Sequence, residues 1–262
     1  SHMVKYLQDR DHEVVVLDDF STGHDWAVKG CEILQVNLLD HDRLASALKG
    51  RQFDGVIHFA AKSLVGESVK QPDLYYRNNV VGSLNLINEM LHNDINNLVF
   101  SSTAAIFGNP VADKITEDHP KNPINPYGQS KLMVENLLRD ICSAYDFNAT
   151  CFRYFNAAGA DASGTIGEDH DPETHLIPNV LKSAIAGGNS LKVFGNDYDT
   201  HDGTCVRDYV HVTDLAQAHL LGLERMRSDA KGFSAYNLGN GNGFSVLDVI
   251  ESCERVVSNS IS

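Results

Sequence analysis

The stretch Glu13-Val14-Val15-Val16-Leu17-Asp18 is a short β-branched run that ends in acidic residues. Apolar runs of this length are typical of strands that are buried on both faces of a parallel sheet. The same form recurs at residues 31–36 (Cys-Glu-Ile-Leu-Gln-Val) and 54–60 (Asp-Gly-Val-Ile-His-Phe-Ala). The first part of the chain therefore predicts a buried parallel sheet.

Segments with helical spacing alternate with further strands. The predicted helices are residues 41–49, 73–92 and 126–141, and the further strands are residues 98–103 and 149–154. This alternation predicts a Rossmann-like, doubly wound α/β fold with helices on both faces of the sheet. Ligands bind beyond the carboxyl ends of the strands in such sheets. The residues that fall at those ends, and that we expect to line one crevice, are Asp18, Phe59, Thr103 and Phe155.

The segment Asn125-Pro126-Tyr127-Gly128-Gln129-Ser130-Lys131 opens the third predicted helix. Tyr127 and Lys131 are four residues apart, so both side chains point from one helix face. A positive charge near a phenol lowers the tyrosine pKa from its usual value of about 10, and the side chain can then exchange a proton with a substrate hydroxyl. A Tyr-x-x-x-Lys pair alone is common by chance, but its place beside the predicted crevice favours a catalytic pair.

The composition excludes several classes of function. The 262 residues carry a formal net charge of −14, which argues against a nucleic-acid partner because such partners require clustered Lys and Arg. No apolar run approaches the roughly 20 residues of a membrane-spanning helix. The cysteines form no Cys-x-x-Cys pair, which indicates a reduced, cytoplasmic compartment. The histidines show no metal-ligand spacing, so we expect no metal site.

The sequence pattern changes after residue 156. Irregular glycine-rich segments at residues 159–171 and 195–204 surround short strands and helices. We expect residues 1–156 to form the dinucleotide-binding domain and residues 157–262 to form mainly a smaller, mixed α/β substrate lobe. Residues 208–223 regain a strand-then-helix pattern and are expected to return to the main domain.

Several motifs together resemble the UDP-glucose 4-epimerase family of the extended short-chain dehydrogenase/reductase superfamily. They run the length of the chain in family order. They include Val56-Ile57-His58-Phe59-Ala60-Ala61, Phe100-Ser101-Ser102-Thr103, Pro126-Tyr127-Gly128-Gln129-Ser130-Lys131-Leu132, Arg153-Tyr154-Phe155-Asn156 and Val206-Arg207-Asp208-Tyr209.

The resemblance implies a mechanism. Tyr127 would deprotonate the sugar 4-hydroxyl while hydride passes from that carbon to a tightly held NAD, and the transient 4-keto sugar would turn over and receive hydride on its other face. Lys131 would lower the Tyr127 pKa and bind the nicotinamide ribose, and Thr103 would hydrogen-bond the sugar oxygen.

The resemblance also implies two sets of binding residues. The cofactor set is Asp18, Asp19, Ser21, Gly23, Asn37, Leu38, Phe59, Ala60, Ala61, Ser63, Asn78, Ser101, Tyr127, Lys131, Tyr154 and Phe155. The substrate set is Thr103, Tyr127, Asn156, His175, Phe194 and Arg207.

Some of these roles have competing interpretations. Asp18 could be only a turn residue, Thr103 could satisfy backbone groups, and Arg207 could form a surface ion pair with Asp208. Asn37 stands where the family often has Asp, and His175 replaces an Asn found in some branches. Ser63, rather than the preceding Lys62, stands where some members have lysine.

The chain departs from the family at its ends. The family's first strand and Gly-x-x-Gly-x-x-Gly turn are not in the sequence, nor is the segment expected after Ser262. The spacing to the Val14–Asp18 run makes Ser1 and His2 native positions in this alignment, rather than a tag. Without that central strand, we expect unpaired edges on its two neighbours.

The favoured function is an NAD-dependent epimerase that acts on a UDP-hexose, as a cytoplasmic homodimer formed through the Tyr127 helix and the helix at residues 73–92. One alternative is an inactive fragment or accessory binding protein. Another is a sister nucleotide-sugar dehydratase or decarboxylase. Dehydratases of this superfamily place Asp-Glu after the strand-end threonine, whereas Ala104 and Ala105 follow Thr103 here, which favours epimerisation.

Overall fold

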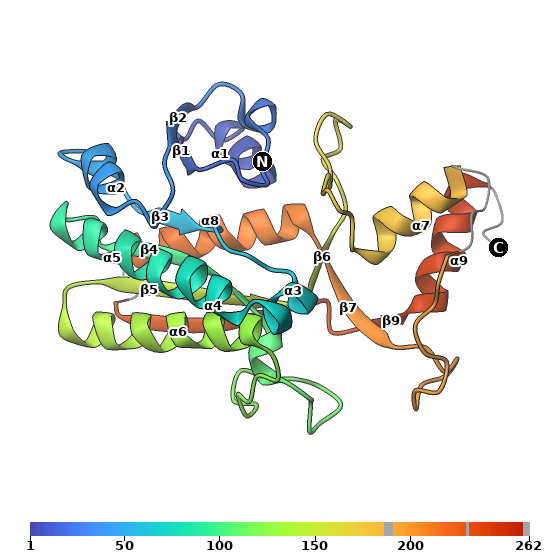
Figure 1. Cartoon of the computed structure of the whole chain (residues 1–262). Coiled ribbons are helices and arrows are strands. Elements are labelled where there is room, and N and C mark those ends of the chain that lie inside the picture. The colour runs from blue at the N-terminus through green and yellow to red at the C-terminus, as the bar shows by residue number, and fades with distance from the viewer. Residues whose placement is uncertain (186–190, 229–230, 259–262) are drawn as a thin grey trace. The chain divides into compact units, whose positions relative to one another are not determined.

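The valine-rich run forms strand β1 (Val15–Asp18), which pairs in parallel with β2 (Glu32–Gln35) in a two-stranded sheet. The computed structural model describes residues 1–185, 191–228 and 231–258 (Figure 1). A separate four-stranded parallel sheet has the order β3-β4-β5-β8. Among the described residues, β1 and β3 (Val56–His58) share no ladder. Within the described residues, the parallel strands of this part of the chain therefore form two sheets.

The elements of this part of the chain follow the predicted alternation closely. The remaining strands are β4 (Asn97–Thr103), β5 (Asn148–Tyr154) and β8 (Phe233–Leu238). The helices are α1 (His2–Gln8), η1 (Asp25–Val28), α2 (His41–Leu48), α3 (Val65–Lys70), α4 (Pro72–Tyr75), η2 (Tyr76–Val81), α5 (Gly82–His92), η3 (Ala104–Phe107), α6 (Pro126–Ala144) and α8 (Val212–Ser228).

Strand β4 shows why the four-stranded sheet is covered on both faces. Leu98 and Phe100 are fully buried in the main core, which they share with residues of α5 and α6. Val99 points the other way and packs with Phe152 of β5 and Met226 of α8. Successive strand side chains alternate between the two faces of the sheet, so a continuous apolar run contributes side chains to the core on each face. The predicted Rossmann-like α/β class is confirmed.

The predicted helix at residues 73–92 is interrupted. Residues Tyr76–Val81 form the π-helical segment η2 between α4 and α5. A π-turn inserts one extra residue and often marks a functional site. Here it brings the side chain of Asn79 into the interior, where only 2% of the residue is exposed.

A second compact unit comprises His2, Phe155–Val212 and Gly239–Ser262, and the first comprises Ser1, Met3–Tyr154 and Thr213–Leu238. The chain thus enters the second unit at Phe155 and returns to the first unit at Thr213–Leu238. The sequence analysis expected residues 208–223 to make this return. In the second unit, β6 (Asn156–Ala158) pairs in parallel with β7 (Val206–His211), and β7 pairs in antiparallel with β9 (Gly243–Ser245).

Two helices pack together in the second unit, α7 (Leu176–Ile185) and α9 (Val246–Val257). Their core contains Val180, Val249 and Cys253. Ser245 begins α9 as its N-cap, because its hydroxyl accepts from the Asp248 amide while the Asp248 carboxylate accepts from the Ser245 amide. Across the described residues, none of the helices is both long and apolar enough to span a membrane.

Candidate active site

Three candidate catalytic side chains come from two adjacent elements of the first unit. Thr103 is the last residue of β4, and Tyr127 and Lys131 lie on the first turns of α6. The Asn125 side chain accepts from the Gly128 amide at 2.8 Å and caps this helix, and Pro126 occupies its first position. The Thr103 hydroxyl accepts from the Ala105 amide at 3.1 Å, which is the backbone role named as its competing interpretation, and it also interacts with the Tyr127 phenol. A helix start and a strand end thus place a tyrosine and a threonine together.

The predicted lowering of the Tyr127 pKa by Lys131 is not observed, because Lys131 is not among the causes that set this pKa. Burial raises the Tyr127 pKa above its ordinary value, and the hydrogen bond with Thr103 offsets this in part. The Lys131 ammonium instead donates to the Ser101 carbonyl at 2.7 Å and lies 4.8 Å from the centre of the Phe100 ring. Helical spacing put both residues on one face, but the nearest acceptor of Lys131 is on β4.

Lys131 is itself strongly affected by its surroundings. The residue is 2% exposed, and burial lowers its pKa to about 7. Desolvation penalises the charged form of a lysine, and no carboxylate contributes to this shift in the opposite direction. The nearby His58 ring is also buried, and burial together with the Lys131 charge lowers the His58 pKa to about 3. A shifted lysine beside a tyrosine at a strand end is the pattern expected of a functional site.

Two further tyrosines surround this cluster. The Tyr154 hydroxyl, at the end of β5, hydrogen-bonds the Ser101 hydroxyl of β4, and burial raises the Tyr154 pKa. The Tyr75 ring stands edge-on to the Tyr127 ring with 6.5 Å between centroids, and the Tyr75 hydroxyl donates to Glu67 at 2.8 Å. Ser101 and Tyr154 were both predicted site residues, and the structure brings them together.

Acidic side chains gather at the carboxyl end of β1. Asp18 Oδ1 accepts from the Phe20 amide at 2.7 Å, and Asp19 Oδ1 accepts from the Ser21 amide at 2.9 Å. Both carboxylates therefore support the turn after β1, which is the competing interpretation for Asp18. Gly23 lies beside the other carboxylate oxygen, since a Cβ added to it would lie 3.6 Å from Asp18 Oδ2. The turn role and a ribose-binding role are compatible, because the Phe20 amide engages only Oδ1.

Asn37 joins this turn to the end of β2. Its amide donates to Asp19 Oδ2 at 2.7 Å, and its carbonyl oxygen accepts from the Leu39 amide at 2.8 Å. The next predicted residue, Leu38, is held by the Asn85 side chain, which donates to the Leu38 carbonyl at 2.8 Å.

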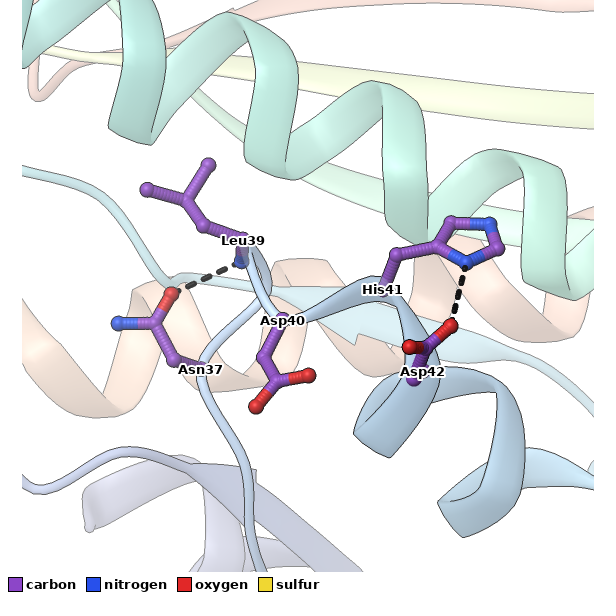
Figure 2. A pocket seen from close by; sticks show the side chains of 5 residues that line it. All are labelled: Asn37, Leu39, Asp40, His41 and Asp42. Carbon is purple, nitrogen blue, oxygen red and sulfur yellow. Dashed lines mark hydrogen bonds and ion pairs between the residues drawn. The ribbon is translucent and has the colours of Figure 1, made fainter.

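An open hollow lies beside Asn37, between β2 and the start of α2 (Figure 2). Its lining residues are Asn37, Leu39, Asp40, His41 and Asp42. The hollow contains none of the predicted catalytic side chains, and its two aspartates disfavour a phosphate. An exposed leucine and an amide instead suit the edge of a flat, uncharged ring.

The loop after β3 carries the next group of predicted cofactor residues. Phe59 is 45% exposed, and its ring lies 4.8 Å from that of His219 on α8. The His219 Nε2 atom is buried without a hydrogen-bond partner in the part of the chain that the structure describes. Ala60 and Ser63 are also exposed, and Ala61 is partly so. This loop thus presents an aromatic ring and small side chains at the carboxyl edge of the sheet.

Asn79 is a structural residue that the sequence analysis missed. The sequence analysis assigned only its neighbour Asn78, whose side chain donates to Asn79 Oδ1 at 3.1 Å. Asn79 accepts from the Lys62 amide at 2.8 Å and donates to the Lys62 carbonyl at 3.0 Å and to the Ser130 hydroxyl at 3.0 Å. It therefore ties the loop after β3 to the helix of Tyr127.

A buried ion pair, also missed, joins the three elements around the site. Glu135 of α6 is 0% exposed and Arg153 of β5 is 2% exposed, with 2.7 Å between Glu135 Oε2 and Arg153 Nη2. The Ser102 hydroxyl of β4 donates to Glu135 Oε1 at 2.5 Å. Charged hydrogen bonds of this geometry fix the position of α6 against β4 and β5.

The second unit holds the remaining predicted residues. Asn156 donates to the Asp208 carbonyl at 2.8 Å, Arg207 donates to its own neighbour's carbonyl on Val206 at 2.9 Å, and Phe194 is 84% exposed. The Asp208 carboxylate accepts from the Asn240 and Gly241 amides at 2.8 and 2.9 Å. Within the described residues no ion pair joins Arg207 to Asp208, so the surface-pair interpretation of Arg207 is not what the structure has.

Two other predicted residues of the second unit have local partners. Phe155 lies against Gly239, where an added Cβ would come within 3.2 Å of the phenylalanine ring. His175 contacts the Glu168 carboxylate, and this hydrogen bond raises the His175 pKa.

The residues of the first unit fit NAD at its two ends. The Asp18 carboxylate beside Gly23 offers an acceptor for a ribose hydroxyl, and the hollow at Asn37 suits an adenine edge. Tyr127, Lys131 and Ser101 supply polar groups at the other end, and His219 Nε2 offers a buried acceptor beside Phe59.

Comparisons with known proteins give the family of this chain. The family model described as NAD dependent epimerase/dehydratase matches residues 1–239. The UDP-glucose 4-epimerase of Halalkalibacterium halodurans is 48% identical over 261 residues, which cover 100% of this chain and 78% of that protein. The UDP-glucose 4-epimerase of Streptococcus mutans is 45% identical over 264 residues, with 100% and 79% covered.

Solved structures are similarly close. The UDP-glucose 4-epimerase of Brucella ovis in complex with NAD superposes with a TM-score of 0.95 at 44% identity and covers 99% of this chain and 80% of its own. The enzyme of Bifidobacterium longum in complex with NAD⁺ and UDP gives a TM-score of 0.93 at 36% identity, with 99% and 80% covered.

Proposed function

The chain belongs to the NAD-dependent epimerase/dehydratase family, and from this premise we propose that it interconverts UDP-glucose and UDP-galactose by inverting the sugar at C4. The observation that carries the proposal is the cluster of Thr103, Tyr127 and Lys131 at the carboxyl end of β4, in a chain 48% identical to a UDP-glucose 4-epimerase. Relatives with solved structures contain NAD, which supports NAD as the cofactor here.

In this reaction the cofactor transfers the hydride and the protein transfers the proton. When bound, NAD supplies the acceptor and then the donor of the C4 hydride. Tyr127 takes the proton of the sugar 4-hydroxyl and later returns it, so the sugar passes through a transient 4-keto form. Thr103, already hydrogen-bonded to Tyr127, holds the same sugar oxygen. Burial of this cluster keeps water away from the exchanging proton.

The Tyr127 pKa has to fall for this step, because burial raises it. The Thr103 hydroxyl already acts in the required direction. Lys131 supplies donors for the nicotinamide ribose, while Asp18, Asn37 and the loop from Phe59 to Ser63 hold the rest of the cofactor.

The substrate is assigned to residues of the second unit. A guanidinium matches a diphosphate with paired hydrogen bonds, which suits Arg207. Asn156, His175 and Phe194 complete the proposed contacts with the sugar nucleotide.

One feature favours this reaction over the dehydratase alternative. Thr103 is followed by Ala104 and Ala105 in η3, so the strand end offers no carboxylate for removing water.

The five cysteines are free thiols, which agrees with a cytoplasmic setting.

The proposal is tested by bound nucleotide and by turnover. We expect denatured, purified chain to release close to one equivalent of NAD, and the native chain to convert UDP-galactose to UDP-glucose. The released nucleotide is quantified enzymatically and the sugar products by chromatography. A chain that holds no NAD, and takes up none on soaking, would instead support the inactive binding-protein alternative.

We further infer that the chain is a homodimer, with α6 and the helices of residues 72–92 at the contact. Met133 of α6 is 39% exposed and Val81 of η2 is 44% exposed. Light scattering after size-exclusion chromatography should give about twice the 28.8 kDa mass of one chain. The double variant Met133→Glu, Val81→Glu should run as a monomer, and a monomeric wild-type chain would contradict the inference.

A further inference from the structure

Two histidines and two glutamates converge in the loop that precedes α7 in the second unit, at the end of the yellow segment of Figure 1. The residues are Glu168, His170, Glu173 and His175, and one ligand atom from each lies within 4.8 Å of the other three. The spacing Glu-x-His-x-x-Glu-x-His matches no helix face, which is why the sequence analysis saw no metal-ligand pattern.

The contacts inside the cluster centre on Glu168. His175 Nδ1 contacts Glu168 Oε1, and His170 Nδ1 lies 3.3 Å from the same oxygen. His170 Nδ1 is also 3.8 Å from Glu173 Oε1. The two imidazole rings stand perpendicular, with 5.2 Å between their centroids. Two ring nitrogens and two carboxylates therefore point into one small volume.

Glu173 supplies an independent indication of a ligand. Its side chain is only 5% exposed. Glu173 Oε1 accepts from the Thr174 and His175 amides, each at 2.9 Å, while Oε2 is buried with no hydrogen-bond partner in the described part of the chain. A buried carboxylate oxygen without a partner is costly, unless a cation or donor binds it.

We propose that this loop binds one divalent transition-metal cation of the Zn²⁺ type through Glu168, His170, Glu173 and His175. His175 would use Nδ1, the atom that faces Glu168, which leaves its Nε2 for the proposed contact with the sugar nucleotide. Two neutral imidazoles and two carboxylates form a ligand set with a charge of −2, which a divalent cation neutralises. Imidazole nitrogen favours Zn²⁺ and its neighbours in the transition series over the hard cations Ca²⁺ and Mg²⁺.

The geometry requires only a small adjustment. Zn²⁺ binds His nitrogen and carboxylate oxygen at about 2.0–2.2 Å in a tetrahedron, so its ligand atoms lie roughly 3.4 Å apart. The four atoms here already lie within 4.8 Å of one another. The bound ion would replace the His175–Glu168 contact and engage the free Glu173 oxygen, which would fix the loop in front of α7.

A second cluster in the same unit provides an internal comparison. His201, Asp202 and Asp248 also lie within 4.8 Å of one another. That cluster has a single imidazole, and Ser245 already engages both carboxylates, through its hydroxyl to Asp202 and its amide to Asp248. It therefore lacks the second nitrogen ligand and the unpartnered oxygen of the loop before α7.

The test is Zn²⁺ binding by the full chain after EDTA treatment, with zinc chloride alone as the probe, measured by titration calorimetry and by metal content after dialysis. We expect one equivalent for the wild-type chain. His170→Ala and Glu173→Gln should each bind at least about tenfold more weakly, because even partners of metal ligands contribute 10–100-fold. His201→Ala, the matched control, should bind like wild type.

The His170 side chain is 49% exposed, so its removal leaves the fold in place, which circular dichroism verifies. The proposal is overturned if the wild-type chain retains no zinc, if His170→Ala and Glu173→Gln both keep wild-type affinity, or if His201→Ala abolishes binding. No substrate or NAD is present in these measurements, so their outcome is separate from that of the epimerase assay.

Discussion

Replacing Tyr127 with phenylalanine is expected to lower the epimerase kcat by about 10²–10⁴-fold, the range that a positioned acid–base group contributes. The substitution removes only the hydroxyl. The ring and its edge-on contact with Tyr75, at 6.5 Å between centroids, are kept. NAD content and KM should therefore change much less than kcat. The measurement is steady-state turnover of UDP-galactose, together with the nucleotide released on denaturation.

Tyr145 provides the matched control, because it stands at the other end of the same helix and is 57% exposed. Tyr145→Phe should turn over like wild type. If Tyr127→Phe retained more than about a tenth of wild-type kcat with full NAD content, the phenol could not be the group that exchanges the proton.

Replacing Glu135 with alanine should lower the free energy of unfolding by about 3–5 kcal/mol, since it leaves a buried guanidinium without its counter-charge. Arg153 is 2% exposed and donates to both carboxylate oxygens of Glu135, from Nε at 2.9 Å and from Nη2 at 2.7 Å. Ser102 would lose its partner as well. Urea denaturation followed by circular dichroism measures the change.

The exposed pair of Glu251 and Arg255 on α9 is the control for this prediction. Glu251→Ala should cost at most about 1 kcal/mol, because solvent screens a surface pair. The double variant Glu135→Leu, Arg153→Met should recover much of the loss, since an apolar pair of similar volume can replace a buried ion pair. A loss below about 1 kcal/mol in Glu135→Ala would show that Arg153 finds another partner.

The fold was predictable because most of its elements have strong local signals. Short apolar runs identified β1, β2, β3, β4 and β5 to within two residues at each end. The strand-end residue Thr103 was predicted because position along a strand fixes which end of the sheet a residue reaches, whereas Ser101 was predicted from the family resemblance.

The remaining features depend on long-range geometry. The π-helical segment that buries Asn79 leaves no trace in apolar periodicity, because the change is one inserted residue. The direction of the Tyr127 pKa shift depends on burial, and Lys131 finds its acceptor thirty residues away on β4. The loop before α7 brings together His170 and His175 by folding back, and spacing rules for helices do not detect that.

The trio of Ser102, Glu135 and Arg153 has a consequence for how this chain can diverge. Each of the three side chains is buried and hydrogen-bonded within the trio, so loss of one leaves a buried charge or hydroxyl without that partner. The effects of their substitutions on stability are therefore not additive. Evolution can reach an apolar trio only through an unstable intermediate or by simultaneous change. The three positions are therefore expected to be inherited as a block, and the orientation of the Tyr127 helix with them.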